Sequence, residues 1–453
     1  MTVRQRKHGR MDATEELRTT ASANEVPRTR QSNLGMAFAV LASAYFLAHF
    51  HRISLGVLAL DLKESLNTGA QALSLLSAGY FYVYGALQIP IGLLADRYGV
   101  RLLSAGLSFV AAIGSVLLAL APSFPVALVG RLLVGAGVSG AYVSALRFFA
   151  RRLPPRRFAT AVGILVAVGN AGGLAATTPL VFLNAMLGWR ATFLVVAAMS
   201  LIVAMLAWAL IDDKPEMCGG PVRDVPRIKG GNPESHLAAT SIREILGNRT
   251  LVKAALTVAG RYGPHVAFLG VWGSLYLRTV HSLSPVVAGN VLMAMSVGYA
   301  AGGPALGYAS DRLLGHKAVL VASTAVCAMG WVPLLAARNP LPAFSLFCLA
   351  LVMGVAGGGG AVAFSMAKES VQHARAGTAV ALVNTTGFLG SAVFQSITGF
   401  LLDGCGSMPA IDAAVFRRVI TLSMIGSLVS LVCALGAEES LKRAEGAVIP
   451  VDS

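Results

Sequence analysis

The chain has 453 residues, of which 55% are apolar and only 13% are charged, and its mean hydropathy is +0.69. A soluble domain carries about 25% charged residues, so this composition excludes a water-soluble globular protein. The formal net charge of +15 would suit nucleic acid, but the positions of the basic residues favour a membrane-topology signal, and no nucleic-acid partner is expected.

Long apolar segments recur along the chain, and a helix needs about 20 such residues to cross a bilayer. They predict an all-α integral membrane protein with twelve transmembrane helices in two six-helix, pseudo-symmetric bundles. The predicted spans are 34–60, 72–95, 101–121, 124–147, 158–185 and 189–211, then 250–278, 284–310, 317–337, 341–367, 376–402 and 418–436.

A polar interval at 212–249 separates the two bundles. It contains four prolines and two Gly-Gly pairs, which is typical of a linker rather than a folded domain. The predicted division is an N-terminal tail, a first bundle, this linker, a second bundle and a C-terminal tail, at 1–33, 34–211, 212–249, 250–436 and 437–453.

The basic residues predict how the chain is oriented. If the N-terminus is cytoplasmic, 26 of the 36 Lys and Arg residues fall in cytoplasmic segments and 6 in outer loops. Cytoplasmic loops carry the excess of Lys and Arg in membrane proteins. Both termini are therefore expected on the cytoplasmic side of a cell (inner) membrane.

No pattern in the sequence points to a cofactor. The five cysteines lie far apart without metal-binding spacing. The segment from Gly135 to Gly140 matches G-x-G-x-x-G, but neither a preceding strand nor a later acidic residue accompanies it. Because a nucleotide-binding loop and a catalytic His/Asp/Glu cluster are also absent from the sequence, we expect no metal, no cofactor, no enzymatic activity and no ATP-driven pump.

Two short patterns recur at nearly the same offset along the chain. The segment Gly92–Gly99 returns as Gly307–Gly315, and Thr160–Val162 returns as Thr378–Val380. A duplicated six-helix unit explains both. Parallel repeats of this kind place a substrate site at their interface, near the middle of the membrane.

The segment from Gly92 to Arg101, in a chain of twelve predicted helices, resembles the loop signature of the major facilitator superfamily. The resemblance implies a monomeric secondary transporter that works by alternating access. It also implies a conformational latch between the halves, made by Gly92, Asp96, Arg97, Gly99, Arg101, Asp311 and Arg312.

Arg131 opens a segment similar to the second signature of that family, in the fourth helix. The alternative is an arginine near the outer membrane face, which snorkels or binds loop carbonyls. The run from Gly357 to Gly360 indicates a close-packed or flexible piece of the tenth helix.

Three pieces are similar to the organophosphate–phosphate antiporters and their anion-carrying relatives. They are Arg52 in the first helix, Gly260–Gly263 in the seventh, and Asp212–Pro221 after the sixth. The resemblance implies that Arg52 and Arg261 are paired anion-binding arginines. Two departures are the absence of a histidine in the fifth helix, near Asn170, and an eleventh helix that looks like uncharacterised facilitators.

The physics of membrane charges independently favours an anionic solute. An arginine in the bilayer costs at least about 2.5–3.5 kcal/mol on insertion scales, so it usually serves a function. No Asp or Glu occurs anywhere between Asp96 and Asp212. Arginine binds carboxylate and phosphate oxygens in bidentate fashion. The alternative is an arginine paired with backbone or with Asp61.

Other polar residues complete the predicted substrate site. His51 neighbours Arg52, and His265 follows Arg261 by one turn, so either histidine could carry a proton or only donate hydrogen bonds. The predicted substrate-binding set is Arg52, Arg261, His51, His265, Tyr262, Asn170 and Asn384.

The sequence thus predicts a secondary active transporter of a small organic solute, expected to be an anion. The alternative is an exporter of drug-like or apolar molecules driven by proton antiport. The glycine-proline signature of such exporters is missing from the fifth helix.

Overall fold

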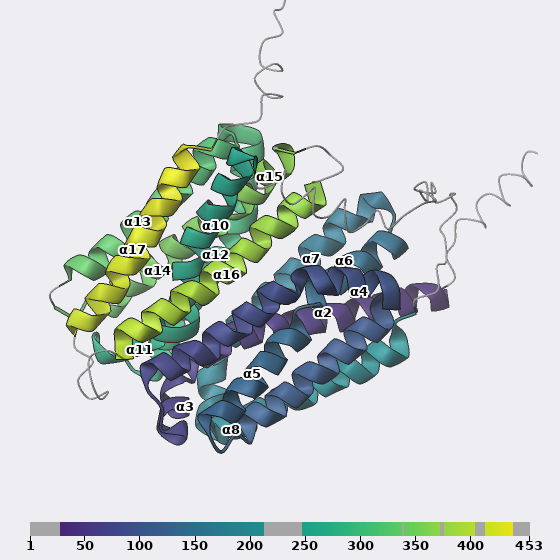
Figure 1. Cartoon of the computed structure of the whole chain (residues 1–453), viewed down its shortest axis with the longest axis horizontal. Coiled ribbons are helices and arrows are strands. Elements are labelled where there is room, and N and C mark those ends of the chain that lie inside the picture. The colour runs from purple at the N-terminus through teal and green to yellow at the C-terminus, as the bar shows by residue number, and fades with distance from the viewer. Residues whose placement is uncertain (1–27, 213–246, 338, 372–375, 404–412, 438–453) are drawn as a thin grey trace, which may run out of the picture.

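The computed structural model describes residues 28–212, 247–337, 339–371, 376–403 and 413–437. Every regular element within these ranges is a helix, which confirms the predicted all-α fold. The helices of the first half of the chain, purple through blue to teal in Figure 1, gather on one side of the molecule, and those of the second half, green to yellow, on the other. Most of the predicted linker and both predicted tails lie outside the described residues.

The helices of the first half are α2 (Arg28–Val57), α3 (Ala59–Leu66), α4 (Ala70–Ala119), α5 (Phe124–Val138), α6 (Ala141–Arg152), α7 (Pro155–Ala175) and α8 (Thr178–Leu210). Those of the second half are α10 (Arg249–Ala267), α11 (Gly273–Thr279), α12 (Pro285–Ala309), α13 (His316–Ala336), α14 (Ala343–Gly358), α15 (Ala361–Glu369), α16 (Ala376–Asp403) and α17 (Ala413–Leu435). Two π-helical turns, η1 (Phe268–Trp272) and η2 (Ser310–Leu314), continue α10 and α12.

Within the described residues, nine helical segments are long and apolar enough to cross a membrane. The protein is therefore a multi-pass membrane protein. The predicted spans 72–95, 158–185 and 250–278 also lie on helices, in α4, α7–α8 and α10–α11. None of these three is among the nine segments that are long and apolar enough to cross a membrane. The number of twelve transmembrane helices therefore stays a prediction.

Three glycines reverse the chain between neighbouring helices. Gly99 inside α4 has φ 80° and ψ 171°, Gly188 inside α8 has φ 77° and ψ 162°, and Gly315 before α13 has φ 81° and ψ 161°. This backbone region is essentially restricted to glycine. Gly99 and Gly315 end the two copies of the repeated loop, so the same turn is built twice.

A second feature is shared by the two halves. In the first half, the helical segment formed by α5 and α6 is broken at Ser139–Gly140. In the second half the break lies at Gly359–Gly360, between α14 and α15. The offset that relates Thr160 to Thr378 carries Gly140 onto Gly358, directly beside this second break. The helix break therefore belongs to the repeated unit.

The two halves meet along α4 and α16, and also where the end of α2 approaches η1 and the start of α12 contacts α8. A Cβ atom at Gly56 would lie 2.6 Å from the carbonyl carbon of Gly270 in η1, so these backbones are in direct contact. The Ser77 hydroxyl donates to the Gly270 carbonyl (3.4 Å), and the Thr178 hydroxyl donates to Asn290 Oδ1 (2.7 Å). Close backbone contact through small residues is how membrane helices pack tightly.

The repeated turns give a stability prediction. Replacing Gly99 or Gly315 by Ala should lower the free energy of unfolding by about 1–3 kcal/mol, because a side chain is strained in this backbone region. The same change at Gly106 is the control, since no atom lies within 4 Å of the added Cβ and its φ is negative. Thermal unfolding in detergent measures the effect, and equal stability of all three variants would contradict it.

Candidate functional site

Arg52, in the second-to-last turn of α2, lies at the junction of the two halves and is only 9% exposed. Its Nη1 donates a hydrogen bond to the hydroxyl of Tyr262 on α10 (3.0 Å). Its guanidinium carbon lies 5.0 Å from the ring centroid of Phe388 on α16 and 5.7 Å from that of Tyr84 on α4. One buried cation therefore contacts helices of both halves.

Among the described residues, no carboxylate forms an ion pair with Arg52, Arg131 or Arg261. The suggested partner Asp61 instead accepts a hydrogen bond from Asn184 Nδ2 (2.9 Å). The alternative in which one of the buried arginines pairs with Asp61 is therefore not found in this structure. Aromatic faces and one hydroxyl stabilise the guanidinium but do not neutralise it.

Further aromatic residues precede Arg52 along α2. Tyr45 and His49 contact each other, with ring centroids 4.4 Å apart, and the Tyr45 ring lies 5.2 Å from that of Tyr142 on α6. None of these three residues belongs to the predicted substrate-binding set. Tyr45 and His49 stand seven and three positions before Arg52, so the helical period places them on the same face of α2 and could have identified them.

Arg261 on α10 binds residues of the second half. Its Nη1 donates to Ser323 Oγ (3.2 Å) and Thr324 Oγ1 (3.0 Å) on α13. Its Nη2 donates to the carbonyls of Ala356 and Gly357 (the latter at 3.2 Å) on α14. The expected convergence of two guanidiniums is therefore absent in this conformation, and the alternative of pairing with backbone describes Arg261.

The repeat spacing explains why the two arginines do not converge. Thr160 corresponds to Thr378 in the repeat, and the same spacing makes Gly270, in η1, the residue that corresponds to Arg52. The spacing between the repeated loops, from Gly92 to Gly307, is three residues shorter. Arg261 therefore lies six to nine residues earlier in its repeat than Arg52 does in its own. At 1.5 Å per residue this displaces it by about 9–13 Å along the helix axis.

Arg131 and His51 form a separate buried contact within the first half. Arg131 is fully buried, donates from Nη2 to the His51 carbonyl (2.9 Å), and lies 4.6 Å from the ring centroid of Tyr80. His51 Nε2 is 3.5 Å from Ser115 Oγ. Arg131 thus neither snorkels nor binds a loop, and His51 contacts α4 rather than the partners of Arg52.

The remaining predicted substrate residues do not all lie around Arg52. Tyr262 binds Arg52 directly, and half-buried Asn384 lies one turn before Phe388 on α16. His265 is 7% exposed, with its ring 5.0 Å from that of Tyr299 on α12. Asn170 is half-buried on α7. The structure brings together Arg52 and Tyr262, with Asn384 nearby along α16.

The predicted latch in the first half contacts its own bundle. Arg101 Nε donates to the Trp208 carbonyl at the end of α8 (2.7 Å), and its guanidinium carbon lies 4.6 Å from the Trp208 ring. Exposed Arg97 lies over the Tyr98 ring (5.4 Å). No atom is within 4 Å of a Cβ placed at Gly92, so no described helix packs closely against it in this conformation. The Asp96 side chain lies outside the described part.

In the second copy of the loop, Arg312 and Asp311 are exposed, and Asp311 Oδ1 lies 3.8 Å from Nδ1 of the buried His316. His316 Nε2 is 3.1 Å from Glu369 Oε1 at the end of α15. These contacts also stay within one half. A latch that joins the halves remains a prediction.

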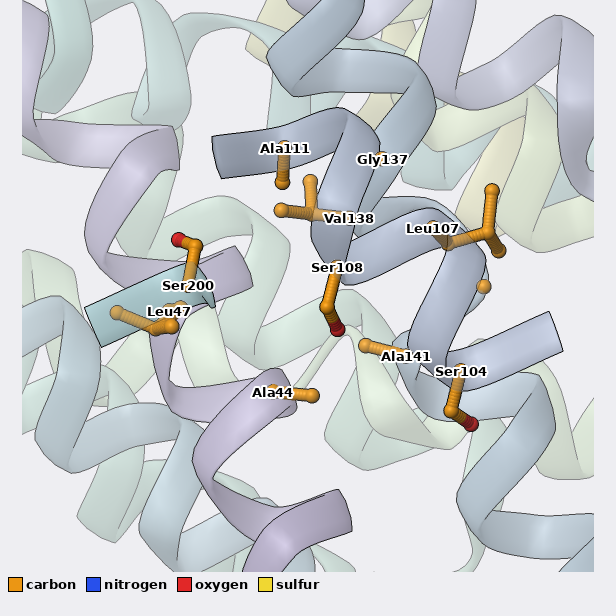
Figure 2. A pocket seen from close by; sticks show the side chains of 11 residues that line it. Ala44, Leu47, Ser104, Leu107, Ser108, Ala111, Gly137, Val138, Ala141 and Ser200 are labelled. Atoms are coloured by element: carbon orange, nitrogen blue, oxygen red, sulfur yellow. The ribbon is translucent and has the colours of Figure 1, made fainter. Parts of the chain in front are cut away.

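A pocket inside the first half, shown in Figure 2, contains none of the predicted substrate residues. Three serine hydroxyls interrupt an otherwise apolar wall between α2, α4, α5, α6 and α8. The lining residues are Ala44, Leu47, Ser104, Leu107, Ser108, Ala111, Gly137, Val138, Gly140, Ala141 and Ser200. A charged solute would find no counter-charge there, so Arg52 rather than this pocket is the candidate site.

Comparison with known families decides the identity. The profile of the Major Facilitator Superfamily matches residues 41–287 and 265–449, which together span most of the chain. The chain belongs to the major facilitator superfamily. It is therefore a membrane transporter, and the facilitator fold explains the two similar halves, the repeated loops and the polar junction between them. Alternating access of this junction to the two sides is the family's mode of secondary transport.

Similar proteins include a probable sulfoacetate transporter, SauU, of Cupriavidus necator, which is 27% identical over 84% of this chain and 89% of its own. The hexuronate transporter of Bacillus subtilis is 25% identical over 79% of this chain and 86% of its own. Among solved structures, a bacterial homologue of the human lysosomal transporter Spinster, inward-facing and unoccupied, has a TM-score of 0.73 at 18% identity, covering 92% of this chain and 99% of its own. It shares the fold of this facilitator.

Replacing Tyr262 by Phe should destabilise the facilitator by about 1.5–3 kcal/mol, because the buried Arg52 loses its hydrogen bond to the Tyr262 hydroxyl across the junction. Tyr308→Phe is the matched control, since Tyr308 is 65% exposed. Thermal unfolding of the two purified variants makes the comparison. A Tyr262→Phe protein as stable as the control would show that the contact is unimportant.

Proposed function

We propose that this facilitator carries a small organic anion, bearing a carboxylate or sulfonate group, across the cell (inner) membrane, and that Arg52 is its principal anion-binding residue. One observation carries the proposal. Arg52 is a buried cation at the junction of the halves, and none of the described carboxylates pairs with it. A cation in this position is most stable when the solute supplies the missing negative charge.

The contacts of Arg52 fit this role. Its Nε is buried and has no hydrogen-bond partner among the described residues, so the guanidinium keeps donor capacity for a ligand. A planar guanidinium can present two parallel N–H groups to the oxygens of one carboxylate or sulfonate. Tyr262 and Phe388 come from the second half, so an anion held by Arg52 would be contacted by both halves at once.

The names of the relatives support the same class of solute. Sulfoacetate carries a sulfonate and a carboxylate, and a hexuronate carries a carboxylate. Both alignments cover most of this chain. The organophosphate antiporters, suggested by three sequence pieces, also carry anions. Carboxylates and sulfonates are the first compounds to test.

The proposal includes the predicted topology. Twelve spans divide into bundles at 34–211 and 250–436, with both termini in the cytoplasm, and the protein acts as a monomer. In that orientation the contacts at Gly56, Ser77 and Thr178 close the outer side of the junction. The conformation is then the one open toward the cytoplasm, and Arg101 at the cytoplasmic side would form part of a latch in the opposite state.

Arg52 gives the direct test. In vesicles containing purified protein and no ATP, Arg52→Gln and Arg52→Lys should each lower counterflow of sulfoacetate or a hexuronate by at least about tenfold, because a bidentate charged contact is lost or weakened. Counterflow of radiolabelled anion into anion-loaded vesicles measures the rate.

Arg151→Gln is the control for removal of an arginine, since Arg151 is exposed at the end of α6. It should transport as the unmodified protein does. Unchanged counterflow in both Arg52 variants would remove Arg52 from the site. A strict requirement for ATP would refute the transport mechanism itself.

A further inference from the structure

The second half contains an arrangement that the proposed anion site does not use. Four consecutive glycines, Gly357–Gly360, occupy the point where α14 ends and α15 begins. The backbone crosses this α14–α15 break through short-range bonds, from Gly359 N to Ala356 O (3.1 Å) and from Gly360 N to Gly357 O (3.2 Å). Each glycine weakens a helix by about 1 kcal/mol relative to alanine, so helix formation is weakest here.

Arg261 binds at this break. The carbonyls of Ala356 and Gly357, which accept from its Nη2, belong to the last turn of α14. Carbonyls at the end of a helix lack the regular bond from the residue four positions later, and here they accept from the backbone only the short-range bonds from Gly359 and Gly360. The helix dipole also makes this end negative. A buried guanidinium can donate to these carbonyls and brings a positive charge to the negative end of the helix. The bonds of Arg261 to Ser323 and Thr324 attach α13 to the same point.

Only some of the four glycines are required by packing. A Cβ at Gly358 would meet the backbone of Gly302 and Gly303 on α12, and one at Gly359 would lie 2.7 Å from Ser323 Oγ. At Gly360 the nearest atoms would be Gly357 O at 3.5 Å and Arg261 Nε at 4.0 Å, which are ordinary contacts. Gly360 therefore has room for a side chain, so its glycine serves the backbone rather than close packing.

The break is also connected to the Arg52 site. Tyr262, which accepts the hydrogen bond from Arg52, directly follows Arg261 on α10. His265, one turn later, lies beside Gly357, where a Cβ would be 3.2 Å from its ring. Movement of α10 at the anion site would therefore reach the α14–α15 break through adjacent residues of one helix.

We propose that Arg261 is a positioning residue that clamps the α14–α15 break, and that it acts on transport through this helix rather than as a fixed ligand of the solute. In this structure the guanidinium holds the end of α14 and α13 together at the α14–α15 break. When it leaves the two carbonyls, α15 can move relative to α14. Only the claim that this motion serves transport rests on the proposed function, since the clamp itself is a property of the anion-free protein.

Hydrogen–deuterium exchange of the anion-free protein tests the clamp and needs no substrate. Arg261→Lys keeps the charge but cannot bridge two carbonyls and two hydroxyls, so exchange of residues 356–363 should rise about tenfold. Exchange of residues 418–430 on α17 should stay unchanged. Adding Gly360→Ala to this variant should restore part of the protection, because alanine stiffens the break.

Unchanged exchange at 356–363 in Arg261→Lys, or an equal rise in α17, would overturn the clamp. If that variant does not fold, the double change Ser323→Ala and Thr324→Ala, which leaves Arg261 with only the two carbonyls, should raise exchange at the same residues about threefold. An unchanged rate there would equally overturn it. Gly106→Ala is the control for adding a methyl group.

A transport measurement then separates the clamp from the proposed function. Gly360→Ala alone should lower the maximal counterflow rate of sulfoacetate or a hexuronate at least about fivefold and leave KM unchanged, because the break moves less readily while the Arg52 site is intact. A raised KM with an unchanged maximal rate would contradict a positioning role. Failure of Arg52→Gln to impair transport would instead refute the proposed function and leave the exchange result standing.

Discussion

The cost of a positive charge inside a membrane governs the arrangement of this protein. Three arginines are buried within the helices, and none of the carboxylates in the described ranges pairs with them. Different groups stabilise the three charges. Arg131 contacts a carbonyl of α2 and a tyrosine ring, and Arg261 contacts two carbonyls and two hydroxyls. Arg52 contacts one hydroxyl and aromatic faces. Each of the three keeps at least one buried guanidinium nitrogen without a hydrogen-bond partner among the described residues, and of the three it is Arg52 that lies between the halves. A buried cation without a carboxylate partner at this junction is what favours an anionic cargo.

The fold places the charge of Arg52 at the junction of the two halves. Glycine turns at Gly99 and Gly315 reverse the chain in both repeats, and close contact between Gly56 and Gly270 brings the ends of α2 and η1 together. As a result Arg52 reaches Tyr262 across the junction. A solute bound there would have different contacts whenever the halves move relative to each other, which is the condition for a ligand to bias a conformational equilibrium.

Much of the fold could be predicted from the sequence, because hydropathy and the repeated loop depend on composition and spacing. The directions of the arginine side chains could not. Arg52 and Arg261 both stand on corresponding helices, and only their difference from the repeat offset shows that they lie at different depths. Tyr45 and His49 could have been found from helical periodicity, whereas Phe388 and Ser323 come from helices whose register against α2 and α10 is set by packing. The glycine run at Gly357–Gly360 indicated a flexible piece of helix, but its contact with Arg261 is visible only in three dimensions.

The most direct test of the central claim is to locate the anion. A structure of the purified protein with 2-bromoethanesulfonate, whose bromine can be located by anomalous scattering, would show where a small sulfonate binds. We expect a peak within hydrogen-bonding reach of Arg52 and beside Tyr262 and Phe388. A peak in the serine-lined pocket of the first half, or beside Arg131, with none at Arg52, would contradict it.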